Sequence, residues 1–245
     1  MHTSDSTLLT RIVNFIQVNR EECLVMEDSA SQRPYQDYVI KDGVLVGDFE
    51  GLYRDFEDPW NQSRNDHIFD SRRQIALNWC RRLRSEDSSN RFLELGCGFG
   101  HLTHQLASEG FTALGIDISE VAIAKAQKLY PESQFAQASL LDFDLFRNFD
   151  ANVYIMAELT WYVLEELDKF LNFLAGEKQR INRPIYLIHL LATYDPGKQK
   201  YGQDKFTNLD EILNYFKLNY LESGFVRTVR IGDEGSQGTF FVARV

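Results

Sequence analysis

The sequence predicts an α/β fold built on a mostly parallel β-sheet. From Arg91 onward, short apolar runs alternate with amphipathic segments of helical periodicity. This alternation is typical of parallel strands joined by helices that cover both faces of a sheet. The last two apolar runs are separated only by a polar turn, and so short a connection cannot join parallel strands. We therefore expect an antiparallel strand pair at the end of the chain.

The N-terminal part has a different pattern. Leu8–Val18 places its apolar residues at near-helical spacing, and Tyr38–Val46 reads as a short hairpin turning at Asp42 and Gly43. An aromatic and acidic segment, Asp48–Trp60, comes next, and a helix is predicted over His67–Leu83. We expect residues 1–62 to form an N-terminal extension that covers the substrate, and residues 63–245 to form the main domain.

The alternating pattern gives each later element a predicted range. The predicted strands are Arg91–Leu95, Thr112–Ile116, Gln134–Gln137, Ala151–Met156 and Pro184–Leu190. The predicted helices are His101–Glu109, Glu120–Leu129, Trp161–Ala175 and Leu209–Leu218. The terminal antiparallel pair is predicted over Phe225–Ile231 and Thr239–Arg244.

Composition narrows the class of protein. The chain has 36 acidic and 26 basic residues and a formal net charge of -10, which disfavours a nucleic-acid partner. It has no apolar run near the ~20 residues that span a bilayer and no signal-peptide pattern at its start. Cys23, Cys80 and Cys97 are odd in number and lack metal-ligand spacing. We expect a cytoplasmic protein with no membrane association and no metal.

The strongest local signal is a glycine-rich turn between a strand and a helix. Within Phe92–Thr103, glycines stand at Gly96, Gly98 and Gly100, directly before the predicted helix. Residues without side chains allow a sharp turn and close approach of a ligand, and the helix N-terminus offers free N–H groups. A dinucleotide site needs a third glycine where this chain has His101, so the turn disfavours a nicotinamide cofactor.

A second signal is the carboxylate of Asp117 at the tip of the next strand. A carboxylate there can accept hydrogen bonds from both ribose hydroxyls of a nucleoside. The alternative role is a helix N-cap, but Ser119 is better placed to cap the following helix. The glycine turn, the acid and the alternating strands together indicate a nucleoside-containing cofactor.

With these features, residues 91–245 resemble the class I S-adenosylmethionine-dependent methyltransferase family. The resemblance implies a Rossmann-like, seven-stranded, mostly parallel sheet with an antiparallel last strand. It implies S-adenosylmethionine as cofactor and S-adenosylhomocysteine as product. In that family the segment matched by Glu94–Gly100 wraps the methionine part of the cofactor, and the acid matched by Asp117 holds the ribose.

The resemblance extends to the rest of the cofactor site, with one departure. The family usually carries an acid that holds the adenine, and the aligned position here is Ser139. Ser139, the backbone of Leu140 or Asp142 could each serve instead. The complete expected cofactor set is Glu94, Gly96, Cys97, Gly98, Gly100, Asp117, Ile118, Ser139, Leu140 and Met156.

The acceptor should bind where the carboxyl ends of the strands meet. The candidate bases there are Glu158 and His189, because an acceptor hydroxyl must lose its proton. His189 has the alternative of a hydrogen-bonded core histidine, and Glu158 could instead hold the methionine ammonium or cap a helix. Expected substrate contacts are Trp60, Trp161, Tyr162 and Tyr194, of which the first three could equally be packing residues. His101 and His104 read as helix-surface residues.

Two further segments resemble particular groups of methyltransferases. Leu52–Trp60 looks like NodS-type methyltransferases, which N-methylate chito-oligosaccharides, and Tyr201–Glu211 is similar to methyltransferases of bacterial polysaccharide pathways. We expect a small-molecule acceptor, a sugar or another metabolite with a hydroxyl or amine group. Two rival functions are a non-catalytic protein that only binds the cofactor and a nicotinamide-dependent oxidoreductase. The sequence leaves a homodimer open.

Overall fold

A computed structural model describes residues 33–60, 62–63, 67–193, 201–227 and 237–245. Tyr35–Val245 forms one compact unit. The helix predicted over Leu8–Val18 and the candidate substrate residue Tyr194 lie outside the described residues.

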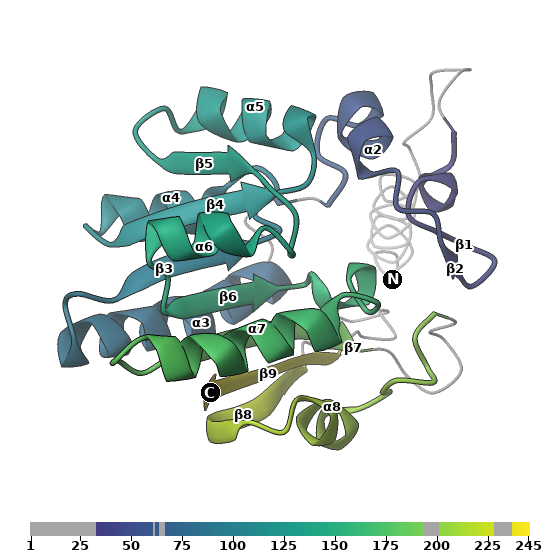
Figure 1. The fold of residues 1–245 in the computed structure, drawn as a ribbon. Coiled ribbons are helices and arrows are strands. Elements are labelled where there is room, and N and C mark those ends of the chain that lie inside the picture. Colours follow the sequence, from purple (N-terminus) through teal and green to yellow (C-terminus); the bar gives the residue numbers. More distant parts are fainter. Residues whose placement is uncertain (1–32, 61, 64–66, 194–200, 228–236) are drawn as a thin grey trace, which may run out of the picture. The chain divides into compact units, whose positions relative to one another are not determined.

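The described part of the chain contains a seven-stranded sheet in the order β5-β4-β3-β6-β7-β9-β8 (Figure 1). Its strands are β3 (Arg91–Leu95), β4 (Thr112–Asp117), β5 (Gln134–Gln137), β6 (Val153–Ala157), β7 (Tyr186–Thr193), β8 (Asn219–Arg227) and β9 (Gln237–Arg244). Strand β9 runs antiparallel to both of its neighbours, whereas β3 to β7 pair in parallel. The mostly parallel sheet with an antiparallel last strand is therefore confirmed.

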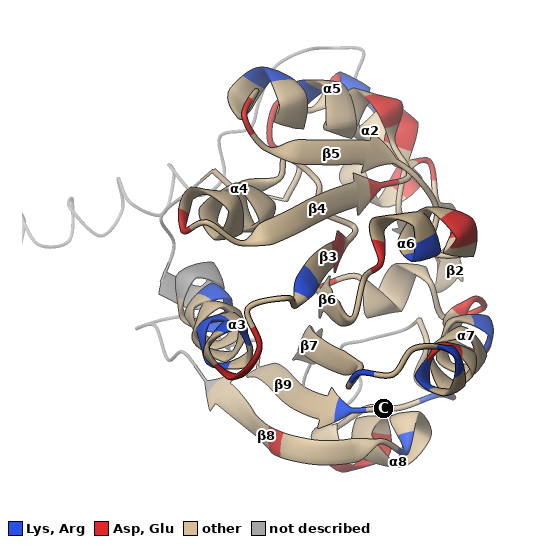
Figure 2. Cartoon of the chain, turned by 60° about the vertical axis from the view of Figure 1, so that its left-hand side comes forward, with Lys and Arg blue, Asp and Glu red and all other residues tan. Residues whose placement is uncertain are grey.

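Helices cover both faces of this sheet (Figure 2). They are α3 (His67–Glu86), α4 (His101–Ser108), α5 (Glu120–Leu129), α6 (Phe143–Phe149), α7 (Leu167–Arg180) and α8 (Leu209–Phe216). Helices α3 and α4 pack through residues such as Leu77 and Leu106 on one face, and α6, α7 and α8 pack on the other. Alternate residues of each strand serve the two faces, so Phe92 and Leu93 enter different cores.

The structure differs from the predicted elements in several places. The segment predicted as one helix over Trp161–Ala175 is a short 3-10 turn, η2 (Thr160–Tyr162), followed by α7. The side chains of Thr160 and Trp161 bond to residues of β7, which holds this segment out of a continuous helix. Helix α6 has only seven residues and was not predicted, and β8 begins six residues earlier than expected, at Asn219.

The segment before α3 consists of η1 (Tyr35–Asp37), β1 (Ile40–Lys41), β2 (Val44–Leu45) and α2 (Phe49–Asp55). The predicted hairpin is confirmed, with its turn at Asp42 and Gly43 in left-handed backbone. Helix α2 was not predicted from the aromatic and acidic segment. Asp48 caps it by accepting a hydrogen bond from the Gly51 backbone.

Polar contacts fix α2 against α5. Glu50 Oε2 accepts a 2.7 Å hydrogen bond from Ser119 Oγ, and Lys125 Nζ donates to the carbonyl oxygens of Tyr53 and Phe56 at 2.6 and 3.1 Å. Ser119 also caps α5, as the sequence predicted. The α2 segment is thus anchored beside the strand tip that carries Asp117.

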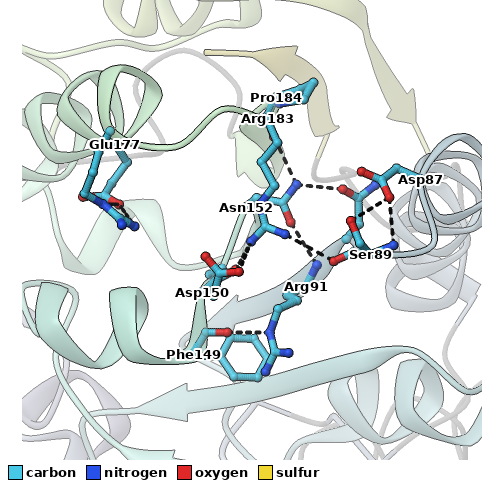
Figure 3. Close-up of polar contacts among 12 residues, drawn as sticks. Asp87, Ser89, Arg91, Phe149, Asp150, Asn152, Glu177, Arg183 and Pro184 are labelled. Atoms are coloured by element: carbon cyan, nitrogen blue, oxygen red, sulfur yellow. Dashed lines mark hydrogen bonds and ion pairs between the residues drawn. The ribbon is translucent and has the colours of Figure 1, made fainter.

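Asn152 organises the opposite end of the sheet, where the strands begin (Figure 3). Its side chain accepts from the Arg91 backbone at 2.9 Å and donates to Asn90 Oδ1 at 2.7 Å and to the Pro184 carbonyl at 3.0 Å. One buried amide therefore links the beginnings of β3, β6 and β7. Asn152 lies at the opposite end of the strands from their carboxyl ends, so its role is to stabilise the fold.

None of the helices in the described residues combines the length and the apolar character that crossing a bilayer requires.

Candidate functional site

A cavity of about 500 Å³ opens at the carboxyl ends of the parallel strands. Its walls come from the residues that follow β3, β4, β5 and β6, from Leu190 and Ala192 within β7, and from the segment that precedes α3. Of the predicted site residues, those that line it are Trp60, Glu94, Gly96, Cys97, Asp117, Ile118, Ser139, Leu140, Glu158, Trp161 and Tyr162. The convergence expected at this edge of the sheet is therefore present.

The glycine-rich turn adopts left-handed backbone at each of its three glycines, with φ of 69° at Gly96, 53° at Gly98 and 76° at Gly100. Gly98 has a second constraint, because a Cβ there would lie 2.7 Å from Gln62 Oε1 and 2.9 Å from the Tyr53 hydroxyl. Only glycine accommodates both the backbone and these neighbours without strain. Gly98 and Gly100 shape the turn without lining the cavity themselves.

Asp117 ends β4 with its carboxylate held in place by the backbone. Its Oδ2 accepts a 2.9 Å hydrogen bond from Gly98 N, and its Oδ1 accepts a 3.0 Å hydrogen bond from Ser119 N. The residue is 6% exposed and lines the cavity. Burial raises the pKa of Asp117, and the two backbone donors oppose that rise. Each carboxylate oxygen keeps a lone pair for a ligand hydroxyl.

Glu94 is a second buried carboxylate on the cavity wall. Its Oε2 accepts hydrogen bonds from the backbone N and the hydroxyl of Thr103, in the first turn of α4. Burial raises the pKa of Glu94 to about 7, against the lowering effect of these hydrogen bonds. Glu94 therefore links the end of β3 to the helix that follows the glycine turn.

The candidates for the adenine contact after β5 differ in their position relative to the cavity. Ser139 and Leu140 line the cavity, whereas Asp142 lies outside its lining. Asp142 Oδ2 accepts a 2.6 Å hydrogen bond from Ser139 N, so Asp142 shapes this loop from behind. Met156, also expected at the cofactor, is fully buried in the core and does not line the cavity.

Glu158 follows β6 and lines the cavity together with Arg72. Its Oε1 lies 2.5 Å from Arg72 Nη1, and its Oε2 accepts a 2.7 Å hydrogen bond from the Ala192 backbone. Glu158 has φ of 60°, a left-handed conformation unusual for this residue type. Burial raises the pKa of Glu158, and Arg72 opposes that rise. Its left-handed backbone makes the position a candidate functional one.

His189 is placed differently from Glu158. It is fully buried in β7, its Nε2 is hydrogen bonded to Thr160 Oγ1 at 2.7 Å, and its ring stacks on Phe241 at 4.5 Å. Burial lowers the pKa of His189 to about 3. It is not among the residues that line the cavity. The structure thus gives it the alternative role, that of a hydrogen-bonded core histidine behind η2.

Aromatic rings form one side of the cavity. The ring centroid of Tyr162 lies 5.3 Å from that of Trp60 and 5.4 Å from that of Phe49. All three residues line the cavity, and we call them the aromatic wall. The Trp60 indole donates a 2.8 Å hydrogen bond to the Tyr53 hydroxyl. Trp161, in contrast, is 5% exposed and packs on Phe206, so it belongs to the core as well as to the lining.

Several lining residues were not predicted from the sequence as site residues. The polar and aromatic ones are Tyr35, Phe49, Tyr53, Gln62, Arg72, Arg73, His101 and Glu166. His101, interpreted above as a helix-surface residue, is half-buried with its Nδ1 2.6 Å from the Tyr130 hydroxyl. The signal that could have identified it is its position directly after Gly100. Arg72 and Arg73 gave no such signal, because only the packing of α3 brings them to the cavity.

Comparisons with known proteins match this chain to methyltransferases. A family model described as "Methyltransferase domain" matches residues 92–175. A protein of Geobacillus sp. (strain WCH70), named "Putative methyltransferase", is 32% identical over 132 residues, which are 52% of each chain. The present chain therefore spans about half the length of the curated relative that it matches.

Solved structures share the fold at low sequence identity. N-methyltransferase NodS from Bradyrhizobium japonicum WM9 has a TM-score of 0.53 at 18% identity, covering 74% of this chain and 99% of that one. TehB from Haemophilus influenzae has a TM-score of 0.52 at 17% identity, covering 77% and 66%. NodS has also been solved with S-adenosyl-L-homocysteine.

Proposed function

We propose that this chain, which a methyltransferase-domain family model matches over residues 92–175, is a class I S-adenosylmethionine-dependent methyltransferase that methylates a small molecule. The acceptor is a sugar or another metabolite with a hydroxyl or amine group. The observation that carries this proposal is the Asp117 carboxylate, which lies buried at the cavity wall and is hydrogen bonded to Gly98 of the glycine turn.

The residues present suit the cofactor. Asp117 would accept from the ribose hydroxyls, and Ser139 and Leu140 would contact the adenine. Gly96, Cys97 and Ile118 would contact the cofactor from the two adjacent strand ends. Arg73 and His101 line the cavity beside the glycine turn and suit the carboxylate of the methionine part. The cofactor, when bound, supplies the electrophilic methyl group.

The chain's own part is to align the acceptor and exclude water. Aromatic faces such as those of Trp60 and Tyr162 suit sugar rings or planar acceptors, and carboxylates suit hydroxyl or amine donors. The segment before α3 supplies one side of this enclosure, and the contacts of Glu50 and Lys125 hold that segment on α5. This arrangement supports a small acceptor.

The test is calorimetric titration with S-adenosylmethionine and S-adenosylhomocysteine. We expect binding in the micromolar range by the intact chain and its loss in Asp117→Ala. Asp144→Ala, an exposed acid of α6 outside the cavity, is the matched control and should bind normally. Absence of binding by the folded intact chain, or equal binding by Asp117→Ala, would contradict the proposal. Methyl transfer from labelled S-adenosylmethionine then separates an enzyme from a protein that only binds the cofactor.

A further inference from the structure

We propose that the acceptor group is an amine, held between the Glu158 carboxylate and the aromatic wall of Phe49, Trp60 and Tyr162. This inference rests on the proposed function and chooses between the hydroxyl and amine acceptors that the proposed function allows. It starts from the distribution of charge and aromatic faces around η2.

Two carboxylates stand on either side of the turn that presents Tyr162. Glu158 lies two residues before η2 and Glu166 four residues after it, and both line the same cavity as Tyr162. Leu159, between Glu158 and η2, packs so closely on the glycine turn that a Cβ on Gly96 would lie 2.8 Å from its Cδ1. The residue that directly follows Glu158 therefore packs beside the part of the cavity that Gly96 lines.

Acids beside aromatic faces favour a positive charge. When an amine is methylated, its nitrogen lone pair forms the C–N bond while the C–S bond breaks, with the electron pair left on sulfur. An amine that binds as its ammonium form first loses one proton to water, which frees the lone pair. The nitrogen then regains positive charge as the C–N bond forms, and the product can release a second proton to water. Glu158 would accept a hydrogen bond from the amine N–H, and this bond strengthens as the charge develops.

A hydroxyl acceptor has a different requirement, because its oxygen must lose a proton during transfer. His189, which could have taken that proton, is buried behind η2, and its Nε2 is hydrogen bonded to Thr160 Oγ1. Within the described residues, His101 is the histidine of the lining, and it is bonded to Tyr130 at the glycine-turn end. The residues around η2 are thus better suited to stabilise a cation than to remove a hydroxyl proton.

The geometry of Glu158 fits a hydrogen-bond acceptor rather than a base. Arg72 Nη1 lies 2.5 Å from Oε1, and the Ala192 backbone N–H donates to Oε2 at 2.7 Å. One lone pair on each oxygen remains to accept a hydrogen bond from the amine substrate. Arg72 is 5% exposed, and a Cβ on Gly238 would lie 2.6 Å from Arg72 Cδ, so Gly238 of β9 leaves space for this side chain. Elements from α3, β6, β7 and β9 together fix one carboxylate at the cavity.

The experiment compares two probes that share a ring, benzylamine and benzyl alcohol. Each is titrated by ligand-observed NMR into the full chain saturated with S-adenosylhomocysteine, whose neutral sulfur removes the competing sulfonium charge. We expect benzylamine to bind at least about tenfold more tightly than benzyl alcohol. Glu158→Gln should abolish this preference, whereas Glu165→Gln, an exposed acid three residues after Tyr162, should keep it.

Equal affinities for the two probes, including no measurable binding of either, would overturn the inference, as would a preference that persists in Glu158→Gln. A second arm incubates the protein with S-adenosylmethionine carrying a 13C-methyl group and a small-metabolite extract. A labelled methyl on nitrogen supports the inference, and one on oxygen overturns it. Binding of S-adenosylhomocysteine is measured first. If it does not bind, the proposed function is contradicted. If it binds, the comparison of the two probes tests only the inference that the acceptor is an amine.

Discussion

The backbone N–H of Gly98 donates a 2.9 Å hydrogen bond to Oδ2 of Asp117 and so joins the glycine turn to the tip of β4. The carboxylate is thereby fixed before any ligand arrives, and its second oxygen is fixed by Ser119. A prealigned carboxylate loses less conformational entropy when a ribose binds. The same hydrogen bond makes the shape of the turn and the orientation of the acid depend on each other.

Gly98→Ala should therefore weaken both stability and cofactor binding. The left-handed φ of 53° costs a residue with a Cβ about 1–2 kcal/mol, and that Cβ would press on Gln62 and Tyr53. Gly176→Ala is the matched control, because a Cβ there meets nothing within 4 Å on helix α7. It should stabilise the protein by about 0.5–1 kcal/mol. Urea denaturation and titration with S-adenosylhomocysteine measure both effects, and similar results for the two variants would refute this account of the turn.

Arg72→Met should destabilise the fold strongly and Glu158→Gln should partly rescue it. Removing one partner of a buried ion pair leaves an uncompensated charge and costs about 3–5 kcal/mol. The partial exposure of Glu158 places the expected cost at the lower end of that range. A double-mutant cycle in urea gives the coupling energy. Additive effects of the two substitutions would show that the pair contributes no coupling.

His189 should make stability depend on pH. The folded state keeps His189 neutral because its pKa is lowered to about 3, whereas the unfolded chain protonates it below its ordinary value of about 6.5. The contribution of His189 to the free energy of unfolding is thus complete above pH 6.5. It is lost as the pH falls toward 3, by about 1.4 kcal/mol per pH unit. Glu94, with a pKa raised to about 7, acts in the opposite direction, so the effect is read as a difference from His189→Leu.

Urea denaturation of the two proteins at pH 5, 6 and 7 provides that difference. The stability of the original chain relative to His189→Leu should fall on acidification. Parallel pH profiles for the original chain and His189→Leu would show that His189 is protonated in the folded state.

Lys125→Met should loosen the α2 segment without unfolding the sheet. The Lys125 ammonium bonds to two carbonyl oxygens at the end of α2, and hydrogen bonds to charged groups contribute more than neutral ones. We expect hydrogen exchange of residues 49–56 to accelerate about tenfold, while β3 and β4 keep their protection. Lys128→Met, exposed on the same helix, is the control. Unchanged exchange in residues 49–56 would show that other contacts hold this segment.

Much of the fold could be predicted from local patterns. The bounds of β3, β5 and α5 agree with the sequence prediction, because apolar runs bounded by turn residues define them. Helix α7 was predicted to begin too early, since the hydrogen bonds that turn Thr160 and Trp161 toward β7 connect residues about 30 positions apart. Such long-range bonds leave no periodic trace in the sequence.

The sequence by itself determined the glycine turn, the acid at the strand tip and the alternation that places both at one edge of a parallel sheet. These features are local, since a left-handed turn needs glycine and a strand tip needs only its own residues. The tertiary structure alone decided that Glu158 lies at the cavity with Arg72, while His189 lies behind η2. Glu158 follows β6 and His189 lies within the neighbouring strand β7. The partners that fix each side chain, Arg72 of α3 and Phe241 of β9, lie far away in the sequence.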